Sequence, residues 1–100
     1  MIKTDIIIIG AGPVGLFTVF EAGLLKMKCH LIDVLPKAGG QCIELYPKKP
    51  IYDIPAYPEI LAGDLIEKLI NPNSQFKPGF TLGEKAEKLA KNKDGTFTVT

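Results

Sequence analysis

Three glycines near the N-terminus have the spacing of a phosphate-binding loop. Residues 10–15 are Gly-Ala-Gly-Pro-Val-Gly and fit the pattern G-x-G-x-x-G. In such a loop the first glycine makes a tight turn, the second lets the backbone touch a pyrophosphate, and the third lets a helix approach a strand. The pyrophosphate lies on the N–H groups at the positive end of that helix. Gly10, Gly12, Pro13 and Gly15 are therefore predicted to bind a dinucleotide, and a glycine-rich turn without a ligand is the alternative.

An acidic residue follows at the distance that a dinucleotide site needs. Asp33 stands eighteen residues after Gly15, at the end of the next expected strand, and its carboxylate can accept hydrogen bonds from the adenosine ribose hydroxyls. The same carboxylate would repel the 2′-phosphate of NADP, and the sequence contains no arginine that could receive that phosphate. The site is therefore predicted to take FAD or NAD, with a surface aspartate as the structural alternative.

A second group of residues favours a flavin over NAD. The pair Gly39-Gly40 would let the backbone approach a bulky planar group, and Gln41 offers both a donor and an acceptor to a ribityl chain or flavin edge. Tyr46 could stack on the ring system. The alternatives that the residues leave open are a Gln41 amide that caps its own loop backbone and a half-buried loop tyrosine at position 46.

Hydrophobic patterning supplies the elements that position these residues. Residues 4–10 contain four successive isoleucines, a run typical of a strand buried on both faces of a parallel sheet. From Pro13 to about Met27 the apolar residues repeat at helical spacing, and residues 29–34 are predicted to form a second strand. Together these segments predict a right-handed βαβ unit with the glycine loop inside it.

The rest of the chain predicts further elements of an α/β fold. Five prolines and three tyrosines shape a long connection over residues 36–58, and such connections usually serve function. A second helix is expected to begin near Leu61 and to end before Pro72. Residues 80–82 could form a third strand. A hairpin around Asp94-Gly95 is predicted because residues 96–100 alternate as a strand should, so the helix-prone residues 85–91 are assigned to its partner strand.

The composition excludes several other functions. Twelve lysines, no arginine and eleven acidic residues give a net charge of +1. This balance does not predict binding to nucleic acid or to an anionic membrane. The longest uncharged run, residues 6–20, is too short to span a bilayer. Cys29 and Cys42 form neither a disulfide framework nor a metal set and are expected to be unpaired, half-buried thiols, and His30 is expected to be structural. We therefore expect a cytoplasmic protein with no metal ion, nucleic acid or membrane as partner.

The same residues carry a resemblance to a known family. The sequence resembles the N-terminal segment of ferredoxin–NADP reductases of the thioredoxin-reductase-like type, over essentially the whole chain. The glycine loop is shared with many flavoproteins, whereas the tyrosine–proline motifs are much more specific. The motifs that carry the resemblance are Gly-Ala-Gly-Pro-Val-Gly-Leu-Phe at 10–17, Gly-Gly-Gln at 39–41, Leu-Tyr-Pro at 45–47 and Ile-Tyr-Asp-Ile-Pro-Ala-Tyr-Pro at 51–58.

The resemblance implies a Rossmann-like FAD-binding fold and an enzyme that passes electrons between NADPH and ferredoxin through FAD. It implies that Asp33 binds the adenosine ribose, that Gly40 and Gln41 lie at the flavin, that Tyr46 stacks on the isoalloxazine, and that Ala86 meets the adenine through its backbone. A homodimer is implied for the full-length protein. No catalytic residue is expected in this segment. The alternatives are a thioredoxin-reductase-like disulfide oxidoreductase and a nucleotide-binding fragment without turnover.

The resemblance also implies how much of such an enzyme this chain contains. Full-length members are about three times longer and insert an NADPH domain into the FAD domain, so residues 1–100 are expected to be the N-terminal part of an incomplete FAD-binding domain. The NADPH site is expected to lie outside this segment. A dithiol like that of glutathione reductase cannot form here, because Pro47 stands where a second cysteine would follow Cys42.

Overall fold

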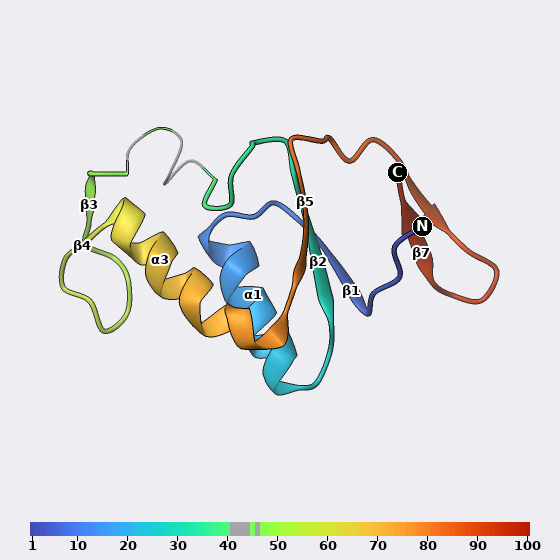
Figure 1. The fold of residues 1–100 in the computed structure, drawn as a ribbon, viewed down its shortest axis with the longest axis horizontal. Helices are drawn as coiled ribbons and strands as arrows, with labels where there is room; N and C mark the ends of the chain where they lie inside the picture. Colours follow the sequence, from blue (N-terminus) through green and yellow to red (C-terminus); the bar gives the residue numbers. More distant parts are fainter. Residues whose placement is uncertain (41–44, 46) are drawn as a thin grey trace.

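The computed structural model describes residues 1–40, 45 and 47–100, with only the backbone of residues 72–74. In that part of the chain a three-stranded parallel sheet is accompanied by two α-helices, a short antiparallel strand pair and a hairpin (Figure 1). The elements in chain order are β1 (Ile6–Ile9), α1 (Pro13–Leu24), β2 (Cys29–Asp33), β3 (Pro50–Ile51), β4 (Ile60–Leu61), α3 (Ala62–Asn73), the 3₁₀ turn η1 (Ser74–Phe76), β5 (Gly79–Leu82), β6 (Leu89–Lys91) and β7 (Phe97–Val99).

The parallel sheet has the order β1-β2-β5, which places β1 at one edge. Its register pairs Ile8 with Leu31, and Leu31 with Phe80. The predicted βαβ unit is therefore confirmed as β1, α1 and β2, and the predicted third strand is confirmed as β5. All three strands end at the edge from which the glycine loop leaves β1, as parallel strands require.

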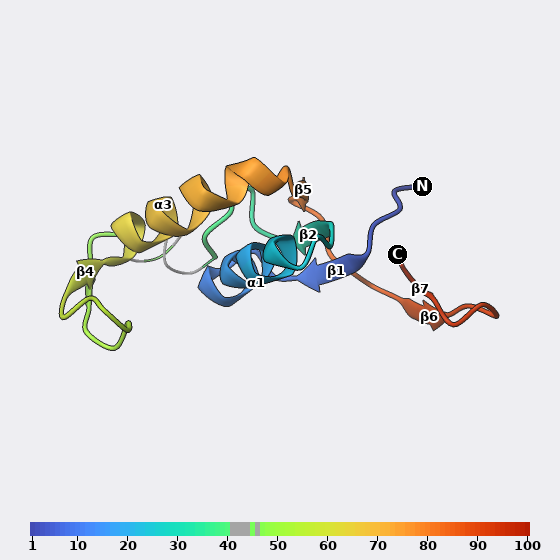
Figure 2. The same cartoon turned by 90° about the horizontal axis from the view of Figure 1, so that it is seen from below.

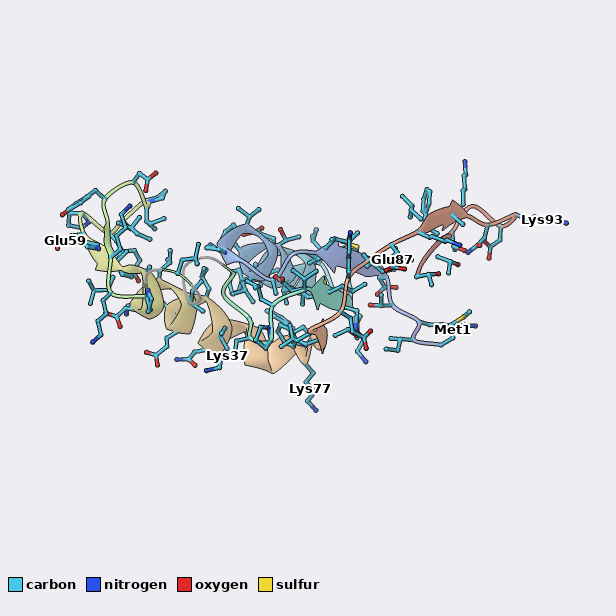
Figure 3. All side chains as sticks on the ribbon, turned by 90° about the horizontal axis from the view of Figure 1, so that it is seen from above. Met1, Lys37, Glu59, Lys77, Glu87 and Lys93 are labelled. Carbon is cyan, nitrogen blue, oxygen red and sulfur yellow. The ribbon has the colours of Figure 1, made fainter. Side chains whose placement is uncertain are left out.

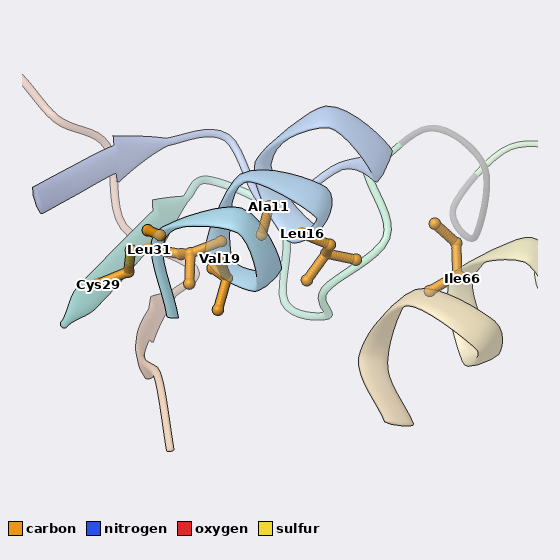
Figure 4. Packing of buried hydrophobic residues seen from close by; sticks show 7 residues of the cluster. Ala11, Leu16, Val19, Cys29, Leu31 and Ile66 are labelled. Atoms are coloured by element: carbon orange, nitrogen blue, oxygen red, sulfur yellow. The ribbon is translucent and has the colours of Figure 1, made fainter. Parts of the chain in front are cut away.

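A single apolar cluster joins helix α1 to the sheet (Figure 4). Leu16, Val19 and Ala22 project from α1 onto Cys29 and Leu31 of β2, and all five side chains are buried. Helix α3 adds Ile66 to this cluster and packs along α1. Burial of large aliphatic side chains contributes roughly 1.5–3 kcal/mol each, so this cluster holds the helix whose first turn forms the candidate site.

Strand β1 is covered on one face only, and its side chains there are partly buried. Ile6 and Ile8 pack against the cluster, whereas Ile7 and Ile9 are 36% and 65% exposed on the opposite face. The prediction of a strand buried on both faces is therefore wrong for the described part of the chain. The physical reason is that α1 covers one face, while the β6–β7 hairpin stands apart from the sheet (Figure 2).

The helix ends differ from the predicted ones for identifiable reasons. Helix α1 ends at Leu24 and not near Met27, because Lys26 adopts a left-handed φ of 62°. The N–H groups of Lys26 and Met27 then donate to the carbonyls of Gly23 and Ala22, which closes the helix in a Schellman motif.

Helix α3 starts at Ala62, because Leu61 pairs in β4, and it ends at Asn73. The prediction that it ends before Pro72 is wrong. Pro72 lacks the N–H that would bond to the Lys68 carbonyl, and the helix ends one residue later, where the chain tightens into the 3₁₀ turn η1.

The predicted C-terminal hairpin is confirmed, with a shorter first strand than expected. Strand β6 pairs antiparallel with β7, and Gly95 has a φ of 89° in the turn between them. The Asp94 carboxylate accepts a hydrogen bond from the Thr96 N–H at 3.0 Å.

Two exposed lysines, Lys93 at the tip of this hairpin and Lys77 beside η1, point away from the body of the molecule at separate places (Figure 3).

Gly23 provides a test of the packing between α1 and η1. A Cβ at Gly23 would collide with Cγ of the Phe76 ring, an atom that moves only if the χ1 rotamer of Phe76 or the backbone changes. Phe76 also meets Phe20 edge-on at 6.0 Å between ring centroids. Helix propensity alone predicts that alanine stabilises by about 1 kcal/mol, whereas overpacking costs roughly 1–3 kcal/mol. We expect Gly23→Ala to lower the free energy of unfolding, measured in denaturant.

The control is the same substitution in a Phe76→Ala background. With the ring removed, Gly23→Ala should no longer destabilise, and the two substitutions should be strongly non-additive. A more stable Gly23→Ala single variant would contradict the packing described here.

Candidate nucleotide-binding site

The glycine loop turns sharply at the end of β1. The Gly10 N–H donates to the Ile32 carbonyl at 2.7 Å, and Gly10 then takes a φ of 108° that favours glycine. Five residues later, a Cβ on Gly15 would collide with the Gly10 carbonyl oxygen and lie 3.2 Å from Cγ2 of Ile8. The first and third glycines therefore have the roles that the sequence predicts for them, a turn and a close approach of helix to strand.

The start of helix α1 has the features of an anion site. Gly12 is the N-cap, Pro13 occupies the first helical position, and the first turn contains no acidic residue and no side-chain cap. The first intrahelical bond runs from the Leu16 N–H to the Gly12 carbonyl at 3.0 Å, so helix geometry gives the N–H groups of Val14 and Gly15 no partner within the helix. The dipole adds a partial positive charge at the same place.

The second glycine leaves the backbone open at this helix start. A Cβ on Gly12 would meet nothing within 4 Å, and its φ of −81° and ψ of −170° suit any residue. Neither packing nor backbone conformation therefore requires glycine at position 12. The reason for a glycine here that remains is the one predicted from the sequence: without a side chain, a ligand has room to approach the main chain.

Asp33 lies beside the loop at the end of β2. Its Oδ2 accepts a hydrogen bond from the Ala11 N–H at 2.8 Å, and its Oδ1 accepts one from the Leu35 N–H at 3.0 Å. The carboxylate is part-buried, so a ligand at the helix start would meet it from the exposed side. The structure thus brings the predicted ribose acceptor to the predicted pyrophosphate loop.

The glycine pair at 39 and 40 packs against the same loop. The Gly39 N–H donates to the Ala11 carbonyl at 2.7 Å, and Gly40 has a φ of 57°. A Cβ on Gly40 would lie 3.2 Å from Cα of Gly12. The described contacts thus place both glycines against the phosphate loop, and their predicted approach to a planar ligand stays a prediction.

Three residues singled out in the sequence, Gln41, Cys42 and Tyr46, lie outside the described residues. Ala86 is described, in the segment between β5 and β6, and is partly buried. The start of that segment runs beside the acid, because the Glu84 N–H donates to the Asp33 carbonyl at 3.1 Å. The cofactor contacts of Gln41, Tyr46 and Ala86 stay predictions.

Sequence reasoning missed the part played by Ala11. It is fully buried, and both of its main-chain polar groups are hydrogen-bonded to neighbouring segments, one to Asp33 and one to Gly39. Its position between two glycines was the only signal available, because main-chain hydrogen bonds leave no signature in residue type.

The remaining chemistry-bearing residues lie apart from this loop. His30 shares a hydrogen bond of 2.6 Å between its Nε2 and Oγ1 of Thr81, across β2 and β5, which agrees with a structural role. Cys29 is free and more deeply buried than expected. Burial, followed by the charge of Asp5, raises the pKa of its thiol, which stays protonated at neutral pH.

The described residues contain no group of three or more His, Cys, Asp or Glu side chains placed to hold a metal ion. None of the helices in that part of the chain is both long and apolar enough to cross a membrane. A shallow groove borders α3, and neither the glycine loop nor Asp33 lines it. Its lining residues are Tyr57, Glu59, Ile60, Leu61, Asp64, Glu67, Lys68 and Asn71.

No family model matches the sequence, but curated relatives match it over its whole length. All 100 residues align with ferredoxin–NADP reductase 2 of Christiangramia forsetii at 74% identity and with the ferredoxin–NADP reductase of Flavobacterium johnsoniae at 70% identity. The chain spans 28% and 29% of the length of these two relatives. The resemblance stated from the sequence is confirmed, and the proteins that carry it are oxidoreductases by name.

Solved structures confirm the fold class. Thioredoxin reductase from Streptococcus pyogenes superimposes with a TM-score of 0.75 at 25% identity, covering 91% of this chain and 28% of that one. The T. acidophilum thioredoxin reductase gives a TM-score of 0.78 at 20% identity, over 97% of this chain and 30% of that one. The parallel sheet with its helices is therefore the predicted Rossmann-like fold, and the chain spans less than a third of each neighbour.

The two glycines at 12 and 15 give a paired test of this site. Gly12→Ala should leave the free energy of unfolding unchanged, because its Cβ meets nothing, but should weaken the binding of ADP by about tenfold or more, roughly 1.4 kcal/mol. Gly15→Ala should instead lower the free energy of unfolding by about 1–3 kcal/mol, because its Cβ meets Gly10.

Thermal unfolding and calorimetric titration with ADP separate the two effects. Equal effects of both substitutions on stability, or unchanged ADP affinity in Gly12→Ala, would contradict the division of roles between these glycines.

Proposed function

We propose that residues 1–100 hold the ADP half of an FAD molecule in a ferredoxin–NADP reductase. The observation that carries the proposal is the meeting of three features at one end of the parallel sheet. An open main chain at Gly12, a helix start without acidic residues, and the Asp33 carboxylate lie together there. Identities of 70–74% to reductases of that name support this activity.

The proposed roles follow from the chemistry of each group. The N–H groups of Val14 and Gly15 would donate to the pyrophosphate, and Asp33 would accept from the ribose hydroxyls on the side of its carboxylate that faces away from Ala11. FAD, when bound, supplies the redox chemistry that takes a hydride from NADPH and delivers two electrons singly to ferredoxin, or the reverse. The protein supplies binding and orientation.

The remaining assignments rest on residue type together with the resemblance, and for Ala86 on the resemblance alone. We propose that Gly40, Gln41 and Tyr46 border the flavin, and that Ala86 meets the adenine through its main chain. NADPH would bind outside residues 1–100. A homodimeric, cytoplasmic protein with ferredoxin as its electron partner completes the proposal.

Two other functions are set against this one. A disulfide oxidoreductase is the alternative suggested by the fold, because two thioredoxin reductases share this fold. Their sequence identity to this chain is only 20–25%. A nucleotide-binding module without turnover is the other. The much higher identity to ferredoxin–NADP reductases favours the first proposal over the disulfide oxidoreductase, and turnover of a completed protein decides between the first proposal and the module.

A chimera tests the proposed activity. Residues 1–100 would replace the aligned residues of the 70%-identical F. johnsoniae relative. We expect this chimera to purify with bound FAD and to reduce ferredoxin with NADPH. Residues 1–100 alone should bind FAD weakly and oxidise no NADPH beyond the rate of free flavin. Among the described residues, no strand pairs with the outer edge of β1, and Ile7 and Ile9 are exposed, so the sheet is incomplete there.

The measurements are the visible spectrum of the purified chimera and its steady-state rates with ferredoxin and with a protein disulfide. Turnover of the disulfide in place of ferredoxin would favour the disulfide oxidoreductase. A colourless chimera that oxidises no NADPH would overturn the proposed function.

Tyr46 provides a second test in the same chimera. If its ring stacks on the isoalloxazine, Tyr46→Ala should shift the flavin absorption and slow hydride transfer while leaving thermal unfolding unchanged. The matched control is Tyr52→Ala, because Tyr52 is 67% exposed and lies outside the proposed site. Identical spectra and rates in all three proteins would return Tyr46 to a packing role.

A further inference from the structure

Residues 10–12 have little of their own to fix the path of the loop. Two of the three are glycines, and neither would place a Cβ within 4 Å of another atom. Ala11 is the only one with a side chain, and it is fully buried. The loop is held at its two ends by the bond from the Gly10 N–H to the Ile32 carbonyl and by the bond from the Leu16 N–H to the Gly12 carbonyl. Between those ends, the direction in which it presents its main chain depends on the hydrogen bonds made at Ala11.

Those hydrogen bonds tie the loop to two other segments. The Ala11 N–H donates to Oδ2 of Asp33 at 2.8 Å, and the Ala11 carbonyl accepts from the Gly39 N–H at 2.7 Å. A hydrogen bond to an ionised acceptor is stronger than one between neutral groups. Of the two, the contact with Asp33 is expected to restrain the loop more.

Asp33 is itself held in place. Its Oδ1 accepts from the Leu35 N–H at 3.0 Å, and its main-chain carbonyl accepts from the Glu84 N–H at 3.1 Å. The side chain is thus anchored on one oxygen and restrains the loop with the other.

We propose that Asp33 is a positioning residue for the phosphate loop, in addition to its expected contact with the ribose. Through the Ala11 N–H it sets where Gly12 and the first turn of α1 meet a pyrophosphate. The inference rests on the proposed nucleotide-binding function, and it assigns Asp33 an effect on ligands that have no ribose hydroxyls at all.

A ligand without those hydroxyls separates the two roles. The test uses the chimera after removal of FAD, titrated by calorimetry with ADP and with 2′,3′-dideoxy-ADP. If Asp33 positions the loop, Asp33→Ala should weaken the binding of dideoxy-ADP by about five- to tenfold, as expected for loss of one hydrogen bond. The loss for ADP should be larger, because the ribose contact is removed as well.

Two variants serve as controls. Asp33→Asn keeps an oxygen that can accept the Ala11 N–H, so its affinity for dideoxy-ADP should fall less than that of Asp33→Ala. Asp64→Ala removes an exposed carboxylate of α3 that lies outside the loop, and both affinities should stay unchanged.

The possible results are distinct. Wild-type affinity for dideoxy-ADP in Asp33→Ala would overturn the positioning role and leave the proposed function intact. Tighter binding of dideoxy-ADP would also overturn it, since simple repulsion between the carboxylate and the pyrophosphate would then dominate. Failure of the unsubstituted chimera to bind ADP or FAD would overturn the proposed function and this inference with it.

If Asp33→Ala does not fold, amide hydrogen exchange in Asp33→Asn carries the test. The Ala11 N–H should exchange at least tenfold faster than in the unsubstituted chimera, because a neutral amide oxygen accepts more weakly than a carboxylate. Equal protection of the Ala11 N–H in both proteins would overturn the proposal.

Discussion

The close approach of α1 to the end of β1 is the constraint on which the rest of this structure depends. Gly15 allows it, because any larger residue would meet the Gly10 carbonyl oxygen. The approach brings the first turn of α1 over the end of the sheet, and it lets Leu16 and Val19 reach Leu31 in the core. The contact between Gly15 and Gly10 therefore also places the positive N-terminal end of α1 beside Asp33, which lies at the end of β2.

Around this approach, main-chain hydrogen bonds join segments that are distant in the sequence. Ala11 links the glycine loop to Asp33 and to Gly39, and Glu84 links the segment after β5 to Asp33. A substitution at Asp33 acts on a junction of several segments and not on one ligand contact. That arrangement explains why ribose recognition and loop geometry must be separated by experiment.

Local patterns in the sequence predicted most of the elements. The isoleucine run, the helical spacing after Pro13 and the Asp94-Gly95 turn each act over a few residues, so strands β1 and β7 and helix α1 could be anticipated. The exposure of Ile9, the left-handed Lys26 and the helical Pro72 could not, because each depends on what packs nearby or on how a terminus closes. Similarly, spacing predicted Gly10, Gly15 and Asp33, whereas Ala11 acts through its main chain. Gln41 and Tyr46 were predicted from residue type and the resemblance, and Ala86 from the resemblance alone.

The central claim is that the start of α1 binds a pyrophosphate beside Asp33. A crystal structure of the chimera with FAD tests it most directly. The account predicts pyrophosphate oxygens within hydrogen-bonding distance of the Val14 and Gly15 N–H groups, over the open main chain of Gly12, with the adenosine ribose at Asp33. A pyrophosphate bound elsewhere, for example in the groove beside α3, would contradict it.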